Sequence, residues 1–233
     1  MRTPVTFLLI TIALSGSAAF AQANCGMQCG QERWAIKTLT DNQADAVGHA
    51  TPQDSTVTQL IGQTAPAKLT DTRAPGETKL YHLKALIVGW KIEAQTAAEN
   101  FGMAASAVPS VPDHDFHIVI ADPDNPTNQM IMEVPDPQCQ AVCSSKFLAQ
   151  IQKVRTEVSS RLGQPMDVLQ TLPKPWLVDV TGPAFFDFAH GQDGLAKNCI
   201  EIHPVIALNF LSQQGNAVQP HKAGDLSHKC GKR

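Results

Sequence analysis

The hydrophobic and polar positions divide the chain into a weakly patterned front and a strongly patterned body. Residues 31–77 are rich in Thr, Ala, Asp, Gln and Pro and contain only two short apolar patches, at 34–36 and 57–61. Such a segment buries little hydrophobic surface by itself. We therefore expect an irregular N-terminal arm over residues 24–77 that wraps around the following domain.

The body opens with three segments whose apolar residues are spaced as in β-strands. They cover residues 78–92, 116–121 and 129–134. In the second strand, Phe116, Ile118 and Ile120 share one face, which predicts the side that meets the core. Gly89 stands within the first strand at a point where a strand can bend sharply.

The spacing then changes to that of a helix. Apolar residues recur at intervals of three or four between Phe147 and Leu162, with Ser144 or Ser145 as a candidate N-cap and Gly163 as the stop. Two further strands are predicted over residues 176–188 and 199–210. The predicted order is β-β-β-α-β-β.

This order, mainly β with one helix, predicts a five-stranded OB-fold-like barrel over residues 78–212 and a C-terminal tail over 213–233. A ferredoxin-like sandwich would need a helix after the first strand, and the stretch at 93–112 lacks an apolar stripe. We interpret that stretch as a loop. In OB barrels, ligands lie across strands two and three, between this loop and the one joining strands four and five.

The N-terminus has the pattern of a cleavable signal peptide over residues 1–23. Arg2 precedes the apolar run at 5–14, and small residues follow it. No later segment is long and apolar enough to span a membrane. Without the signal, 17 basic residues face 21 acidic ones, a net charge of −4. The sequence thus predicts a secreted or periplasmic protein. Its net negative charge disfavours binding to nucleic acid but does not exclude a local basic patch.

Six cysteines lie after the signal. They are Cys25, Cys29, Cys139, Cys143, Cys199 and Cys230. An even number in an exported chain predicts disulfides, and six cysteines allow 15 connectivities. The C-x3-C spacing, which occurs twice, differs from the C-x2-C of zinc and redox sites. Cys199 with Cys230 is an attractive pair for holding the tail.

Candidate metal ligands stand at alternate positions of two strands. Asp115 and His117 share one face of the second strand, and Glu201 and His203 share one face of the last. The metal hypothesis uses His117, Glu201 and His203 to bind a divalent ion such as zinc or manganese, and a carboxylate can otherwise act alone as a general base. The alternative is that all four are outward polar residues of ordinary strands.

Candidate ligand-binding residues come from the two loops of the predicted barrel. They are Asp113, Asp115 and His117 near the first loop, and His190, Gln192 and Asn198 in the second. Gly191 and Gly194 also fit a purely conformational role for the second loop. The neighbouring Phe185, Phe186 and Phe188 fit either a stacking platform or a core.

Several phrases resemble a family of uncharacterised exported bacterial proteins. These phrases are CGQERWAIKTLTD, DHDFHIVIADP, MIMEVPDPQC and VDVTGPAFFDFAHGQDGLAKNCIEIHPVI. The family pattern includes D-x-D-Y/F-H, PDPxC and FFDFxHGQ-x-G-x-x-x-N-x-IE-I/L-HPV. The resemblance covers most of the chain after the signal and implies a shared domain without assigning an activity. This chain departs from the pattern by an insertion near 94–112 and by extra cysteines.

Two functions remain open at this point. The first is a non-catalytic exported binding module that recognises an oligosaccharide, a peptide or an envelope partner through the loops at 93–115 and 189–198. The second is a metal-assisted hydrolase, acting on phosphodiesters or glycans, that uses His117, Glu201 and His203. The sequence contains no G-x-S-x-G, H-E-x-x-H, Walker A or dinucleotide fingerprint.

Overall fold

The structure, a computed structural model, describes residues 25–30, 32–93, 114–189, 191–222, 224 and 230–231. The predicted signal peptide and two candidate ligand-binding residues, Asp113 and His190, lie outside the described residues. In the described part, no helix is long and apolar enough to cross a bilayer.

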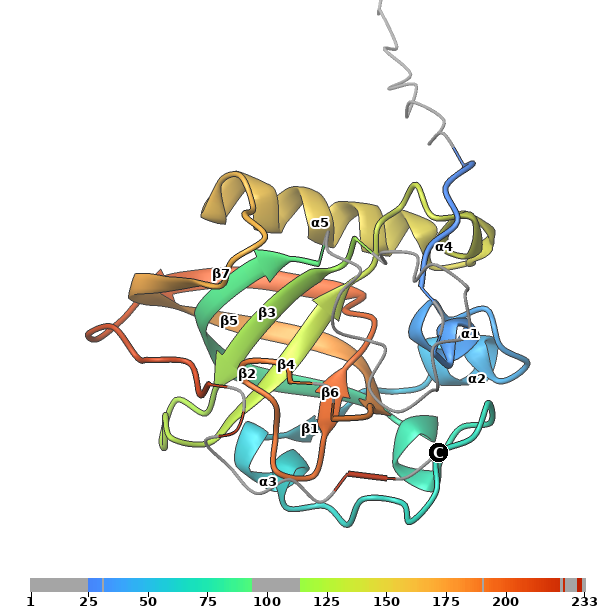
Figure 1. The fold of residues 1–233 in the computed structure, drawn as a ribbon, viewed down its shortest axis with the longest axis horizontal. Coiled ribbons are helices and arrows are strands. Elements are labelled where there is room, and N and C mark those ends of the chain that lie inside the picture. Colours follow the sequence, from blue (N-terminus) through green and yellow to red (C-terminus); the bar gives the residue numbers. More distant parts are fainter. Residues whose placement is uncertain are drawn as a thin grey trace, which may run out of the picture.

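The described residues form a mainly β structure with short helices (Figure 1). The helices are α1 (Trp34–Lys37), α2 (Ala44–Gly48), α3 (Val57–Ile61), the 3-10 helix η1 (Pro75–Thr78), α4 (Gln140–Ser144) and α5 (Leu148–Leu162). The strands are β1 (Gln53–Ser55), β2 (Leu80–Ile92), β3 (Phe116–Ala121), β4 (Gln129–Val134), β5 (Gln170–Phe186), β6 (Ile200–Ile202) and β7 (Ala207–Gln213).

The seven described strands form one mixed sheet in the order β1-β2-β3-β4-β6-β5-β7, and β2 also pairs with β5. The pairs β1–β2 and β4–β6 are parallel, and the others are antiparallel. The register of β2 shifts between Ile87 and Gly89 against both of its long neighbours. This irregularity lies at Gly89, the residue where the strand was expected to bend.

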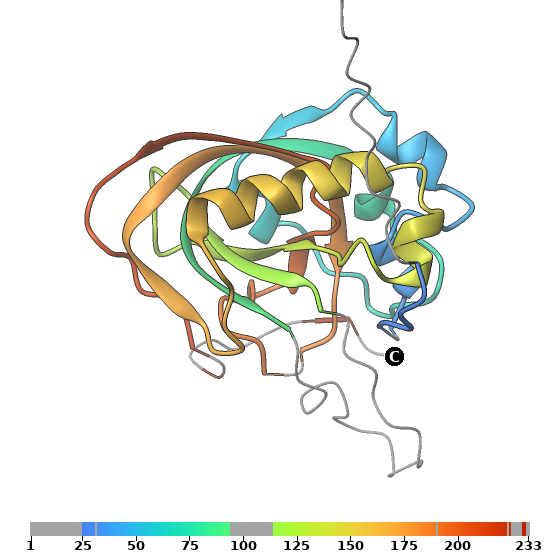
Figure 2. The same cartoon turned by 90° about the horizontal axis from the view of Figure 1, so that it is seen from above.

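The main hydrophobic core lies on one face of this sheet. Phe116, Ile118 and Ile120 of β3 belong to it, as predicted. The helix α5 runs across the sheet (Figure 2) and contributes Ile151 and Val158 to the same core. The helix ends at Gly163, whose φ of 91° is readily adopted by glycine.

The predicted strands at 116–121 and 129–134 agree with β3 and β4, but the element count was wrong. The strand expected at 199–210 is two strands, β6 and β7, because Pro204 lies between them and has no N–H to donate to a ladder. Neither Ser144 nor Ser145 is the N-cap of α5; that position is Phe147.

The prediction of one helix and an irregular N-terminal arm was also wrong. The arm contains α1, α2, α3, η1 and the edge strand β1. Its apolar patches supply Ile36, Val57, Leu60 and Ile61, all buried against the domain. These segments are too short to be stable helices in isolation, so their packing on the sheet stabilises them.

All six cysteines form disulfides: Cys25 with Cys143, Cys29 with Cys139, and Cys199 with Cys230. The last pair confirms the expected link to the tail. The first two tie the start of the arm to α4 and the turn before it. The cysteines therefore hold the chain together and are not metal ligands.

Candidate functional site

A row of polar side chains crosses the sheet on the face away from the main core. His117 of β3 lies directly opposite Lys91 of β2 and Glu133 of β4. Glu201 of β6 lies opposite Ile131, two residues before Glu133. Because residues two apart share a face, Glu133 and Glu201 point to the same side as His117. Residues distant in sequence thus meet through strand pairing.

These side chains are buried, although they face away from the core. Asp115, His117 and His203 have no exposed surface, and Glu201 is 1% exposed. The segment after β5 covers them: Gly194 lies against Val119 of β3, and Leu195 packs on Ile131. The side chains thus face outward from the sheet, as the alternative to a metal site expected, but a loop covers them.

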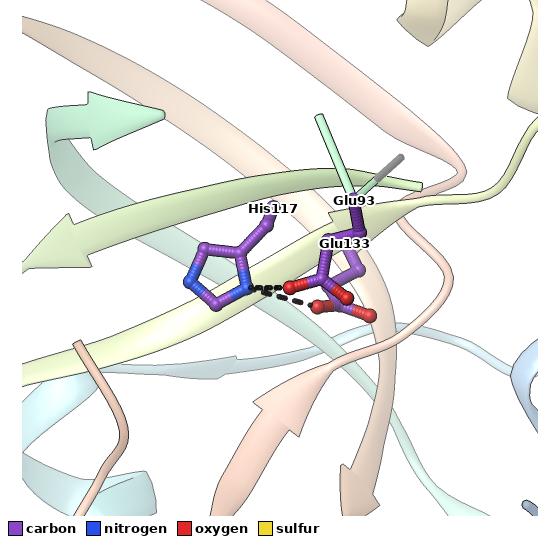
Figure 3. A group of neighbouring side chains, drawn as sticks. All are labelled: Glu93, His117 and Glu133. Carbon is purple, nitrogen blue, oxygen red and sulfur yellow. Dashed lines mark hydrogen bonds and ion pairs between the residues drawn. The ribbon is translucent and has the colours of Figure 1, made fainter. Parts of the chain in front are cut away.

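The first group of side chains surrounds His117 (Figure 3). Its Nδ1 lies 3.1 Å from Glu93 Oε1 and 3.2 Å from Glu133 Oε1. Its Nε2 lies 2.9 Å from the carbonyl oxygen of Asp193. A carbonyl only accepts, so Nε2–H is the donor, and Nδ1 is the nitrogen that faces the two carboxylates.

The second group surrounds His203. Its Nδ1 lies 3.0 Å from Glu133 Oε2 and 3.9 Å from Glu201 Oε2, and its Nε2 lies 3.3 Å from Asp115 Oδ2. Neither ring nitrogen has the angular geometry of a hydrogen bond to any described residue. We therefore treat these contacts as charge–charge contacts. Phe185 closes one side, with its ring centroid 5.6 Å from that of His203.

Burial and the surrounding carboxylates determine the charge on the two imidazoles. Burial acts to lower the pKa of His117, but hydrogen bonds with Glu133 and Glu93 raise it to about 10. Burial likewise acts against the charged form of His203, while Asp115 and Glu133 raise its pKa well above the ordinary value. These interactions favour the cationic form of both imidazoles when nothing else binds there.

The carboxylates divide into two kinds. Burial acts to raise the pKa of Glu133, but contacts with His117 and His203 hold it well below the usual range. Burial and the charge of Glu133 would also raise the pKa of Glu93, yet His117 lowers it to about 2. Burial raises the pKa of Asp115, and burial with the charge of Glu133 raises that of Glu201 to about 7.

The residue types fit a divalent metal ion. Two groups of three, Glu93 with His117 and Glu133, and Asp115 with Glu133 and His203, each offer ligand atoms within 4.8 Å of one another. Carboxylate oxygens and imidazole nitrogens are the donors that zinc, manganese and iron take in proteins. Metal binding would require both imidazoles to be neutral, with one nitrogen of each free to donate its lone pair.

The structure brings the three predicted metal ligands, His117, Glu201 and His203, into one cluster. His117 does not contact the other two directly; Glu133 lies between them. Sequence reasoning missed Glu133 and Glu93. Glu133 was detectable, because it interrupts the apolar run QMIMEV at the position that pairs with His117. Glu93 follows the end of β2 and had no pattern to mark it.

Two of the predicted ligand-binding residues stabilise the loop that covers the cluster. Gln192 donates to the carbonyl of Phe188. The amide of Asn198 is buried and donates to the carbonyls of Leu60 and Gln63, which fixes the loop to α3 and the residues after it. Any contact of these two side chains with a ligand stays a prediction.

The aromatic run before the loop does not form an exposed platform. Phe186 belongs to the main core, and Phe185 is fully buried beside His203. Phe188 is partly buried against the core. Base or sugar stacking on Phe185 and Phe186 is therefore excluded in this arrangement.

In comparisons with known proteins, no family model, no curated protein and no solved structure matches this chain.

Proposed function

We propose that this chain is an exported metal-binding protein that holds a divalent transition-metal ion in the buried cluster around His203. The observation that carries the proposal is a set of buried oxygen and nitrogen atoms that are able to bind a metal and make no hydrogen bond to any described residue. They are Asp115 Oδ2, both carboxylate oxygens of Glu201, and both ring nitrogens of His203. For the two oxygens of Glu201, the lack of hydrogen bonds costs about 1–3 kcal/mol each, and a bound cation would offset that cost.

The OB fold is part of this proposal. Its support is the set of pairings that leads from β2 through β3, β4, β6 and β5 back to β2, with α5 between β4 and β5 in the chain. This is the strand order of an OB barrel. The cluster then lies on the outer face of its second, third and fifth strands, under the loop between the last two.

Export is the other part of the proposal. Its support is the signal-like pattern at residues 1–23 together with three disulfides, which persist in oxidising compartments. The family resemblance stays a prediction and adds no activity.

Metal content and thermal stability test the metal proposal. The mature chain, oxidised and purified without chelator, should contain zinc, manganese or iron by elemental analysis. EDTA should lower its Tm, and adding the metal back should restore it, because an ion that binds only the folded state stabilises it by mass action. At a free metal concentration of 100 times Kd, the gain is about 2.7 kcal/mol.

Two histidine variants provide the matched comparison. His203→Ala removes a buried ligand and should weaken the affinity for the ion beside it at least tenfold. His82→Ala removes a half-exposed histidine that pairs with Asp54 outside the cluster, and it should leave metal content unchanged. A wild-type protein that holds no metal, and whose Tm is indifferent to EDTA and to added zinc, manganese or iron, would refute the proposal.

A metal-assisted hydrolase is a second candidate, favoured by one edge of the cluster. Glu93 is 14% and Lys91 23% exposed, whereas the other members are almost fully covered. Lys91 lies 2.9 Å from Glu93, so a cation stands where an anionic substrate would enter. The metal-loaded protein should then hydrolyse phosphodiester or glycan model substrates, and Glu93→Gln should abolish this activity. The absence of turnover by the wild type would reject this candidate.

The non-catalytic binding module is a separate proposal. Its support is that the described ends of both loops lie near the cluster: the N–H of His114 donates to the backbone carbonyl of Glu93, and the carbonyl of Asp193 accepts from His117. A panel of oligosaccharides and peptides should then contain a ligand whose binding is weakened by Gln192→Ala. Equal binding by wild type and variant across the panel would remove its basis.

A further inference from the structure

We infer that the cluster binds two divalent ions, bridged by the carboxylate of Glu133. This inference rests on the proposed metal binding and adds the nuclearity of the centre. The first ion would take Glu93, His117 and Glu133. The second would take Glu133 and Nδ1 of His203, with Glu201 on the same side of the ring and Asp115 behind its Nε2.

The position of Glu133 is the first argument. Its two oxygens face different histidines: Oε1 lies 3.2 Å from His117 Nδ1, and Oε2 lies 3.0 Å from His203 Nδ1. The two groups of candidate ligands share Glu133 and no other residue. A carboxylate that presents one oxygen to each of two ligand sets is suited to bridge a pair of ions, which in two-metal sites lie about 3.5–4 Å apart.

Buried donors without partners give the second, independent argument. Both oxygens of Glu201 are inaccessible and make no hydrogen bond to any described residue. Oε2 of this side chain points toward His203 Nδ1, 3.9 Å away. Asp115 Oδ2, on the other side of the His203 ring, is also inaccessible and makes no hydrogen bond to any described residue. An acidic cluster of purely structural purpose would satisfy such oxygens with hydrogen bonds.

The orientation of the two imidazoles is the third argument. His117 donates Nε2–H to the carbonyl of Asp193, and His203 has Asp115 next to its Nε2. In both rings, Nδ1 is the nitrogen directed at Glu133. An oxygen acceptor behind the outer nitrogen fixes the tautomer and orientation of metal-bound histidines. The two rings thus have the same arrangement on opposite sides of one carboxylate.

Stoichiometry tests the inference. The full oxidised chain should be stripped with chelator, loaded with manganese(II) and separated from free ion. Elemental analysis should then give two ions per chain, and the EPR spectrum should be that of an exchange-coupled pair. Two uncoupled ions would argue against the bridge, and a single ion would overturn the inference while leaving metal binding in place.

Variants separate the two positions. His117→Ala and His203→Ala should each retain one ion without coupling, and Glu133→Gln should lose coupling and weaken both ions. Glu157→Gln, on α5 outside the cluster, is the control and should retain two coupled ions. If a variant does not fold, the wild-type stoichiometry still decides. No bound ion under any loading condition would refute both this inference and the proposed function.

Discussion

At the scale of single residues, the cluster contains acids and bases whose charges depend on one another. His117 and His203 carry raised pKa values because carboxylates surround them, although burial acts in the opposite direction. Glu201 has a raised pKa of about 7, because it is buried and lies near another carboxylate. Protonation and metal binding therefore compete for the same atoms.

The stability of the metal-free protein should depend on pH through these groups. The pKa of His117 rises from 6.5 to about 10 on folding. Its contribution to the free energy of unfolding is therefore complete below pH 6.5 and is lost as the pH rises toward 10. The raised pKa of Glu201 also removes stability as the pH rises from 4.5 to about 7. The lowered pKa of Glu93 removes stability as the pH falls from 4.5 toward 2.

The metal-free Tm should therefore be highest near pH 4.5, because the contribution of Glu93 is lost below that pH and that of Glu201 above it. It should fall by at least about 3 °C by pH 9, which corresponds to about 1 kcal/mol for a chain of this size. Thermal unfolding in EDTA across this range measures it. His117→Gln should flatten the alkaline decline, and an equally steep decline in that variant would assign the effect to other groups.

At the scale of elements, the segment between β5 and β6 converts a polar strand face into a buried site. Gly194 has a φ of 80°, and an added Cβ there would overlap the side chain of Val119. Gly191 has a φ of 93°, but an added Cβ would meet no described atom within 4 Å. Both glycines relieve backbone strain, and only Gly194 permits close packing on β3.

These two glycines give a matched pair of variants. Gly191→Ala should cost about 1 kcal/mol, from backbone strain only. Gly194→Ala should cost about 2–4 kcal/mol, because steric overlap with β3 adds to the same strain. Urea unfolding measures both costs. Similar losses in the two variants would show that the loop does not need close contact with Val119.

At the scale of the whole molecule, disulfides tie the N-terminal arm to the segment around α4, and a buried network around the Arg33–Glu77 ion pair ties it to the sheet at Phe186. The guanidinium of Arg33 contacts both oxygens of Glu77, at 2.7 and 2.6 Å, and also donates to the carbonyl of Phe186. Glu77 additionally accepts the N–H of Phe186 and of Ala74. Arm and sheet therefore share one network of charge-assisted hydrogen bonds.

Breaking this ion pair should be far more costly than breaking an exposed one. Glu77→Gln leaves Arg33 buried without its counter-charge and should destabilise the protein by about 3–5 kcal/mol. Asp54→Asn breaks the exposed contact with His82 and should cost less than about 1 kcal/mol. Denaturant unfolding of both variants measures the difference; equal losses would mean that the pair does not anchor the arm.

Much of the sheet was predictable from residue order alone. The alternation in FHIVIA and the apolar run QMIMEV located β3 and β4 and the face that meets the core, because strand period is a local property. The paired Asp115/His117 and Glu201/His203 could be identified as candidate ligands for the same reason. The short helices of the arm could not be predicted, since packing on the sheet stabilises them.

The convergence of the site was decided only by tertiary structure. Residue order puts Glu93, His117, Glu133 and His203 far apart, and strand pairing across β2, β3, β4 and β6 brings them together. A loop packs over the polar residues on the outer face and separates them from water. The periodicity of the strands does not predict this packing. The sequence by itself determined which side chains share a face, because that follows from the backbone period. Burial, pairing and charge state depend on long-range contacts, and these exist only in the folded chain.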